Sequence, residues 1–190
     1  GSGPAGLTVA GDLARQGFSV TIFEGQSEAG GVLMYGIPEY RLPKAVVAKE
    51  IEKIEALGVN FVLNCLVGKD ITVDQMFEQG YDAIFIGTGT ALPKSLDIPG
   101  NKLRGIIQSS YLLHMVNIFN QNIVERNAVP LKEGDRVAVI GCGNVAMDAA
   151  RTAVRMGAAS VHVIYHRTEA EMSAIPSEYQ DAVKERGQFL

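Results

Sequence analysis

The chain has 190 residues, of which 47% are hydrophobic and 20% charged, a composition typical of a globular protein with a buried core. Seventeen Lys and Arg residues against 21 Asp and Glu residues give a net charge of -4, and no basic run stands out, so we expect no nucleic-acid partner. No apolar run reaches the roughly 18 residues of a membrane span and no leader sequence is visible, so we expect no membrane partner and a cytoplasmic protein.

The first predicted element is a glycine-rich turn, Gly1-Ser2-Gly3-Pro4-Ala5-Gly6, which leads into a helix over residues 7–16 and a strand over residues 18–23. The first strand of such a unit normally precedes the glycines, so we expect the fold to begin upstream of Gly1. The pattern then predicts, in order, a loop over 25–43, a helix over 44–57 ended by Gly58, a strand over 59–63, a short helix over 73–79, a strand over 81–86 and a turn over 87–90.

In the second half, Ser109 or Ser110 is expected to cap a helix that ends near Asn122. A turn over 132–135 and a strand over 136–140 follow, and the opening pattern then repeats. Its second copy comprises the turn Gly141-Cys142-Gly143-Asn144-Val145-Ala146, a helix over 147–156 and a strand over 161–165. Two such starts predict an α/β fold with two Rossmann-like dinucleotide-binding lobes.

The first glycine turn has the residue types that a dinucleotide requires. Gly1 permits a tight turn, Gly3 lets the backbone approach a pyrophosphate, Gly6 allows close helix packing, and the helix N-terminus faces the phosphates. Glu24 ends the second strand, 23 residues after Gly1, where its carboxylate can accept hydrogen bonds from ribose hydroxyls. The alternative is that Glu24 is an ordinary solvated charge at a strand end.

The second glycine turn differs, because Ala146 takes the third glycine position and no acid ends the following strand. His166 and Arg167 stand there instead. A guanidinium offers a planar fork of donors to a ribose 2′-phosphate, which favours NADP over NAD. Alternatively, Arg167 is a solvated arginine that pairs with Glu169 or Glu171, and His166 is a surface histidine.

Three longer segments resemble the family of the glutamate synthase small (beta) subunit, which includes the flavin part of dihydropyrimidine dehydrogenase and the ferredoxin:NADP oxidoreductase large subunit. The most specific is the fifteen-residue run GGVLMYGIPEYRLPK at positions 30–44, and the others are GTGT at 87–90 and GCGNVAMD at 141–148. The resemblance covers nearly the whole chain. It implies a glutathione-reductase-like fold with an FAD-binding domain over 1–100 and an NADPH-binding domain over 101–190, both incomplete in this chain.

The resemblance also implies roles for individual residues. The FAD pyrophosphate and ribose site is assigned to Gly1, Gly3, Pro4, Ala5, Gly6 and Glu24. The loop under the flavin is assigned to Gly31, Leu33 and Arg41, the adenine contact to the Val67 backbone, and a second FAD turn to Gly89. The NADPH site is assigned to Gly143, Asn144, Val145, His166 and Arg167, with His166 in place of the arginine often found there.

No protein acid or base is expected to be catalytic, because the flavin ring itself carries out hydride transfer. His114 and His162 are interpreted as structural. Cys65 and Cys142 form neither a C-x-x-C redox pair nor a set of metal-ligand spacings, so we expect no metal ligands and no redox role for Cys142.

In the resembled proteins, electrons leave the flavin for iron–sulfur clusters held by a cysteine-rich N-terminal region or a partner. We therefore expect NADPH to reduce FAD, with electrons passing to the glutamate synthase large subunit or an equivalent acceptor, most directly for glutamate synthesis. The alternatives are a ferredoxin-linked NADP transhydrogenase subunit and a non-catalytic nucleotide-binding or assembly module. The chain by itself is expected to bind FAD poorly and to be inactive.

Overall fold

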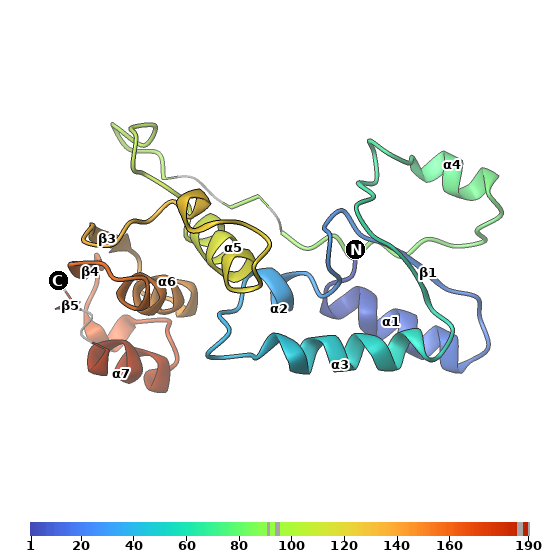
Figure 1. Cartoon of the computed structure of the whole chain (residues 1–190), viewed down its shortest axis with the longest axis horizontal. Coiled ribbons are helices and arrows are strands. Elements are labelled where there is room, and N and C mark those ends of the chain that lie inside the picture. The colour runs from blue at the N-terminus through green and yellow to red at the C-terminus, as the bar shows by residue number, and fades with distance from the viewer. Residues whose placement is uncertain (91, 94–95, 186–187, 190) are drawn as a thin grey trace. The chain divides into compact units, whose positions relative to one another are not determined.

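The computed structural model describes residues 1–90, 92–93, 96–185 and 188–189, and the chain divides into two compact units, Gly1–Leu92 and Pro93–Leu190 (Figure 1). Each unit has its own sheet of parallel strands, so within the described residues no sheet runs through both glycine turns. The assignment of FAD to residues 1–100 and of NADPH to residues 101–190 stays a prediction.

The first unit is built around a short parallel pair of strands with two helices packed side by side (Figure 1). Ile22 lies opposite Phe61 in this pair. The elements are α1 Pro4–Arg15, β1 Thr21–Phe23, α2 Val32–Tyr35, α3 Lys44–Glu55, β2 Asn60–Val62 and α4 Val73–Glu78. Helix α1 begins at Pro4 and not at residue 7, because the fixed φ of proline suits the first helical position, where its missing N–H would have no partner.

Three expectations for the first unit were wrong. Residues 81–86 form no strand, because only β1 and β2 exchange ladder hydrogen bonds among the described residues of this unit, and Ile86 is 73% exposed. Residues 87–90 do not form a turn, although Gly89 has a φ of 66°. The stretch 25–43 is not entirely loop, because the short helix α2 lies within it.

The second unit contains a three-stranded parallel sheet in the order β3-β4-β5. Its elements are α5 Ser109–Asn120, η1 Arg126–Ala128, β3 Arg136–Ile140, α6 Asn144–Arg155, β4 Ser160–Ile164, η2 Glu169–Glu171, α7 Pro176–Lys184 and β5 Gln188–Phe189. The amphipathic helix α6 connects β3 to β4 and covers the sheet with Met147, which is fully buried, and with a row of buried alanines. The predicted strand 136–140 and the turn before it are confirmed.

The cap predicted for α5 was wrong. Ser109 is already the first helical residue, and the preceding Gln108 has the extended conformation of a cap without a capping side-chain hydrogen bond. The sequence pattern also missed α7, which begins at Pro176, and the short strand β5. Like α1, α7 has proline in its first turn.

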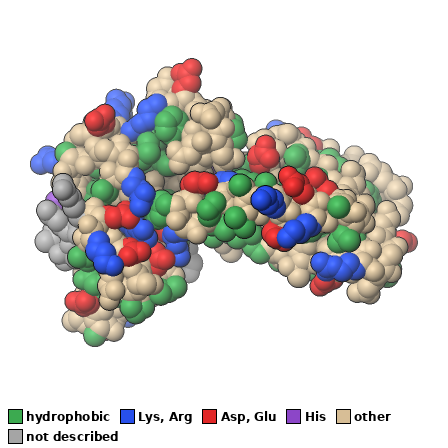
Figure 2. Space-filling view, turned by 60° about the horizontal axis from the view of Figure 1, so that its bottom comes forward, with side chains coloured by type: hydrophobic (Ala, Val, Ile, Leu, Met, Phe, Trp, Pro, Cys, Tyr) green, Lys and Arg blue, Asp and Glu red, His purple; other side chains and the backbone are tan. Residues whose placement is uncertain are grey.

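Acidic and basic side chains alternate over the surface in Figure 2, without a large area of one charge on the face shown. On α3, for example, Lys49, Glu52 and Lys53 are all exposed. None of the described helices is long and apolar enough to span a bilayer. Among the described residues, no cluster of His, Cys, Asp and Glu has the arrangement of a metal site.

Candidate cofactor-binding sites

Two segments of the first unit pack against the turn formed by residues 1–6, namely the start of α2 and the segment at Gly87. A Cβ on Gly6 would lie 2.0 Å from the Gly1 carbonyl oxygen, and a Cβ on Gly31 would lie 2.8 Å from the Gly3 Cα. A Cβ on Gly1 would lie 2.7 Å from the carbonyl oxygen of Gly87. These contacts leave no room for side chains, so the turn, the start of α2 and the segment at Gly87 pack backbone against backbone.

Gly3 differs from its neighbours. It is the N-cap of α1, with an extended φ of -68°, and a Cβ added there would meet no protein atom within 4 Å. The side-chain direction of Gly3 therefore faces open space at the positive end of a twelve-residue helix. No capping side chain occupies this helix end, so its unpaired N–H groups can bind an anion such as a pyrophosphate.

Glu24 lies at the carboxyl end of β1 and is bound to the glycine turn. Its Oε2 accepts hydrogen bonds from the Ser2 N–H at 2.8 Å and from the Ser2 hydroxyl at 2.5 Å. Its Oε1 accepts a hydrogen bond from the Gln26 N–H at 2.9 Å. Glu24 is only 9% exposed, and Ser2 is fully buried. Glu24 is therefore not the solvated strand-end charge of the alternative interpretation.

These hydrogen bonds determine the charge of Glu24. Burial alone raises the pKa of the carboxyl group, but the hydrogen bonds from the Ser2 hydroxyl, the Ser2 N–H and the Gln26 N–H outweigh it and hold the pKa below its ordinary value. The group is thus a carboxylate at neutral pH. Because a carboxylate has about four lone-pair positions and the protein fills three, about one remains on Oε1 for a ribose hydroxyl.

The other residues predicted to bind FAD lie in several parts of the first unit. Pro4 and Ala5 are the first two residues of α1. Leu33 lies on α2 and lines a groove with Pro4 and Leu7. Gly89 lies two residues beyond Gly87, and a Cβ there would meet nothing within 4 Å.

Val67 and Arg41 lie outside the regular elements. Val67 follows β2 and forms an isolated bridge with Ile71, and its side chain is exposed. The backbone hydrogen bonds between β1 and β2 continue past the two strands to Cys65, whose N–H donates to the Glu24 carbonyl oxygen. Val67 therefore lies two residues beyond a backbone contact with Glu24. Arg41 lies between α2 and α3, and its N–H donates to the Pro38 carbonyl oxygen.

In the second unit, the corresponding turn lies where β3 and β4 end side by side. The Gly141 N–H donates to the Ile164 carbonyl oxygen, so the glycines and the residues after β4 share one edge of the sheet. Gly143 is the N-cap of α6 and forms no side-chain capping bond. Cys142 is buried, which raises the pKa of its thiol and disfavours the reactive thiolate.

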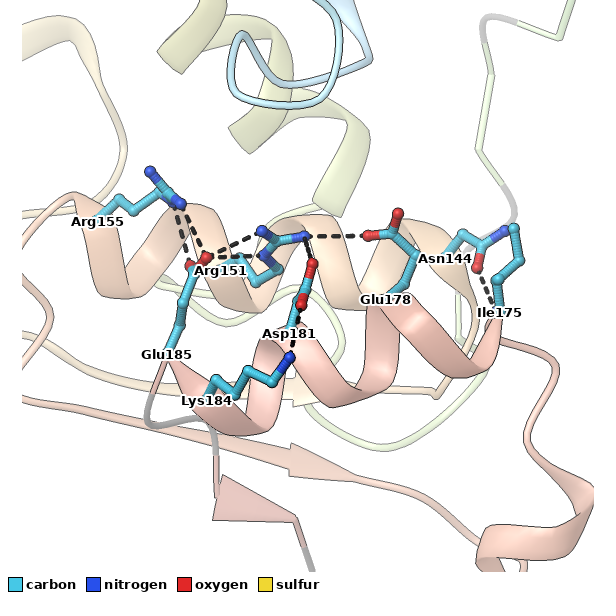
Figure 3. Close-up of polar contacts among 8 residues, drawn as sticks. All are labelled: Asn144, Arg151, Arg155, Ile175, Glu178, Asp181, Lys184 and Glu185. Carbon is cyan, nitrogen blue, oxygen red and sulfur yellow. Dashed lines mark hydrogen bonds and ion pairs between the residues drawn. The ribbon is translucent and has the colours of Figure 1, made fainter.

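A segment that precedes α7 crosses this turn. The Ala174 N–H donates to the Cys142 carbonyl oxygen, and a Cβ on Gly143 would lie 3.3 Å from the Ser173 hydroxyl oxygen. The Asn144 side-chain oxygen accepts the Ile175 N–H at 2.8 Å (Figure 3). The Asn144 amide oxygen is thus engaged in holding the start of α7, so a coenzyme contact from Asn144 would come from a donor, its side-chain NH2 or its backbone N–H. Val145, the next residue, is exposed on the first turn of α6.

His166 and Arg167 both lie exposed beyond the end of β4. The Arg167 Nε donates to the His166 Nε2 at 3.2 Å, and the Tyr165 ring packs edge-on against the His166 ring. Glu171 instead accepts two hydrogen bonds from Thr168, and no ion pair of Arg167 forms among the described residues. The alternative in which Arg167 pairs with Glu169 or Glu171 was therefore wrong.

A buried arginine fixes α7 against α6 (Figure 3). The Arg151 guanidinium, with only 9% of its side chain exposed, contacts Glu178 at 3.1 Å, Glu185 at 2.9 Å and Asp181 at 3.7 Å. Arg155 adds a second contact to Glu185 at 2.8 Å. Because α7 follows the segment that crosses the glycine turn, this network stabilises the entrance to the candidate NADPH site.

Sequence reasoning missed three residues that build these sites, namely Ser2, Gly87 and Arg151, and it did not predict that Lys44 is buried. Ser2 occupies a variable position of the glycine fingerprint, which carries no information on its contact with Glu24. Gly87 belongs to the recognised GTGT segment, but only its approach to Gly1 shows its role. Arg151 and Lys44 are charged residues on helices, and no pattern predicts that they are buried.

The chain matches the family described as pyridine nucleotide-disulphide oxidoreductase over residues 1–188. It is 46% identical over 187 residues to the NADP(+)-dependent formate dehydrogenase subunit beta of Moorella thermoacetica, covering 97% of this chain and 25% of that protein. It is 39% identical over 191 residues to the glutamate synthase (NADPH) small chain of Halomonas elongata, covering 100% of this chain and 40% of that protein. The chain thus spans less than half of either relative.

FprA from Mycobacterium tuberculosis in complex with NADPH has a similar structure, with a TM-score of 0.73 at 21% identity over 97% of this chain and 46% of that chain. Bacillithiol disulfide reductase from Bacillus cereus gives a TM-score of 0.55 at 16% identity, covering 100% of this chain and 65% of that chain. These matches confirm the predicted α/β fold, and the sequence relatives confirm the resemblance to glutamate synthase small chains. The chain therefore belongs to the pyridine nucleotide-disulphide oxidoreductase family.

Proposed function

We propose that the first unit binds FAD, that the second binds NADPH, and that the intact protein transfers a hydride from NADPH to the flavin. The single observation that carries this proposal is the open N-terminus of α1 beside the buried Glu24 carboxylate. The helix end suits a pyrophosphate and the carboxylate suits a ribose hydroxyl, and both groups occur in the adenosine half of FAD.

On the FAD side, each residue has a defined task. The uncapped N–H groups of Ala5 and Gly6 at the start of α1 and the open space at Gly3 receive the pyrophosphate. Glu24 accepts a hydrogen bond from the ribose through Oε1, while Ser2 holds Oε2. The segment assigned to the flavin ring contains Gly31, Leu33 and Arg41. The Val67 backbone is assigned to the adenine of FAD, and Gly89 to the second FAD turn.

On the NADPH side, the N-terminus of α6 at Gly143, Asn144 and Val145 offers a second uncapped helix end to a pyrophosphate. Arg167 has its guanidinium exposed and without a carboxylate partner among the described residues, so it can donate to a ribose 2′-phosphate. His166 accepts one Arg167 N–H and thereby restricts the guanidinium orientation.

When bound, the flavin ring supplies the hydride and electron chemistry, and no acid or base of this chain is needed for that step. The protein binds and orients the two nucleotides. Cys142 fits this division of tasks, because its raised thiol pKa keeps it protonated and unreactive at neutral pH.

The relatives favour one destination for the electrons. A small chain of NADPH-dependent glutamate synthase is similar along the whole of this sequence, which supports electron transfer to a glutamate synthase large subunit, and the resemblance described above adds iron–sulfur clusters as the proposed route. The similarity to a formate dehydrogenase subunit beta supports a second candidate, in which the same NADPH and flavin unit serves an NADP-linked dehydrogenase.

The proposal is tested on the intact protein by measuring released FAD and the NADPH-dependent reduction of ferricyanide. We expect about one FAD per chain and acceptor reduction that requires NADPH. A non-catalytic nucleotide-binding module would bind the nucleotides and leave ferricyanide oxidised, and such a result would exclude the proposed enzyme.

A further inference from the structure

A buried lysine connects the segment assigned to the flavin ring with helix α3. Lys44 is only 8% exposed although it carries a charge. Its Nζ donates to the Leu33 carbonyl oxygen at 2.9 Å and to the carbonyl oxygen of Ile37. Its backbone N–H donates in turn to the Glu39 carboxylate at 3.1 Å. The first residue of α3 is therefore bonded to α2 through Leu33 and to the following segment, residues 36–43, through Ile37 and Glu39.

The Leu33 carbonyl group is one that α2 itself leaves without a partner. Helix α2 has only four residues, and the hydrogen bonds at its end go from Gly36 and Ile37 to the Val32 carbonyl oxygen. A carbonyl group in the last turn of a helix needs a donor from elsewhere. The Lys44 ammonium supplies it, so a residue of α3 caps α2.

Without these two hydrogen bonds, the position of the Lys44 ammonium would be electrostatically unfavourable. Burial lowers the pKa of Lys44, and Glu39 offsets this only in part. Lys44 is also the first residue of α3, where the positive end of the helix dipole repels a cation. A buried cation at a helix N-terminus is stable only with strong acceptors, which here are the two carbonyl groups of the α2 region.

We propose that Lys44 is the positioning residue of the flavin-binding segment: its ammonium fixes the α2 carbonyl groups and thereby places Gly31, Leu33 and Arg41 for FAD. The inference rests on the proposed FAD site. Gly31 contacts Gly3, and Leu33 lines a groove beside the start of α1, so a displacement of α2 reaches the phosphate turn directly.

The test compares the intact wild type with Lys44→Met, which keeps a long apolar stem and removes the charge and the donors. Lys53→Met is the matched control, because Lys53 lies on the same helix with an exposed side chain and pairs only with Glu50 at 2.6 Å among the described residues. Lys44→Arg tests rescue by a residue that retains both charge and donors.

The first readout needs no cofactor: trypsin cleavage after Arg41, followed by mass spectrometry of the FAD-free protein. Lys44→Met removes the trypsin site after residue 44 and keeps the trypsin site at the Arg41–Leu42 bond. We expect cleavage there to accelerate by about tenfold or more, because the Leu33 and Ile37 carbonyl groups both lose their hydrogen bond to the Lys44 ammonium. Lys53→Met should be cleaved at this bond at the wild-type rate.

The second readout is FAD affinity, followed by flavin fluorescence. Lys44→Met should bind FAD at least about tenfold more weakly, since FAD binding must then order a segment that the wild-type protein already holds in place. Lys44→Arg should recover most of the loss, and NADPH affinity should stay unchanged in every variant.

Wild-type cleavage or wild-type FAD affinity in Lys44→Met would overturn the inference, as would an equal loss of FAD and NADPH binding, which indicates general unfolding. If the wild type bound no FAD, the proposed function would fall, together with the flavin role of Lys44. The cleavage rates would still report whether Lys44 holds the segment, which distinguishes the two failures.

Discussion

Replacing Gly3 with alanine separates cofactor binding from folding. The added Cβ would meet no protein atom within 4 Å, and the φ of -68° and ψ of 178° at Gly3 are accessible to alanine. Alanine is a slightly poorer N-cap than glycine, so we expect Gly3→Ala to lower the free energy of unfolding by less than about 1 kcal/mol. The methyl group would instead occupy the space through which a pyrophosphate approaches the start of α1.

The expected effect on FAD is much larger. A pyrophosphate displaced from the helix end loses hydrogen bonds to backbone N–H groups, each contributing about 1.5 to 3 kcal/mol when one partner is charged. Loss of two such bonds weakens binding by roughly 10² to 10⁴-fold, since 1.4 kcal/mol corresponds to about tenfold.

Gly6→Ala is the contrasting variant. Its Cβ would lie 2.0 Å from the Gly1 carbonyl oxygen, so the backbone has to move and both stability and FAD binding should suffer. The assays are urea unfolding and FAD titration of the apoprotein, in each case with the intact protein. FAD affinity of Gly3→Ala within about threefold of wild type would refute this reasoning, because the pyrophosphate would then lie elsewhere.

Three further outcomes are expected. Arg167→Ala should raise the Michaelis constant for NADPH by about tenfold and leave that for NADH nearly unchanged, and equal changes for both coenzymes would show that Arg167 does not contact the 2′-phosphate. Arg151→Met should destabilise the second unit by about 3 kcal/mol in urea unfolding, because it leaves Glu178 and Glu185 without their buried partner, and a stability equal to wild type would contradict the role of the network. Burial raises the Glu185 pKa, but its bonds to Arg155 and Arg151 prevail and lower it, so its stabilisation should be complete above the ordinary value of 4.5 and disappear as the pH falls through the lowered value; the extra stability of the wild type over Glu185→Gln should therefore be full above 4.5 and vanish in that acid range, and a difference independent of pH would contradict this.

Local patterns predicted several elements. The apolar run over residues 137–140 placed β3 correctly, and the helical spacing placed α3, which ends at Glu55, shortly before the predicted terminator Gly58 with its φ of 90°. The strand predicted over residues 81–86 failed because an apolar run becomes a strand only where a neighbouring strand provides hydrogen bonds. A single segment does not contain that information.

The candidate sites show the same limit. The glycine fingerprint and Glu24 could be read from spacing, because a tight turn and a strand-end acid each have a fixed position in the βαβ unit. The hydrogen bond from the Ser2 hydroxyl to Glu24, and the burial of Lys44 beneath Leu33, join segments that are distant in sequence. Contacts of this kind depend on tertiary packing and leave no periodic signal.

The most direct test of the proposed function is rapid mixing of the anaerobic intact protein with NADPH while the flavin absorbance is followed. We predict that the oxidised flavin band bleaches in a single turnover, and that NADH at the same concentration bleaches it more slowly. A flavin that stays oxidised in the presence of saturating NADPH would contradict the proposal that these two nucleotide sites exchange a hydride.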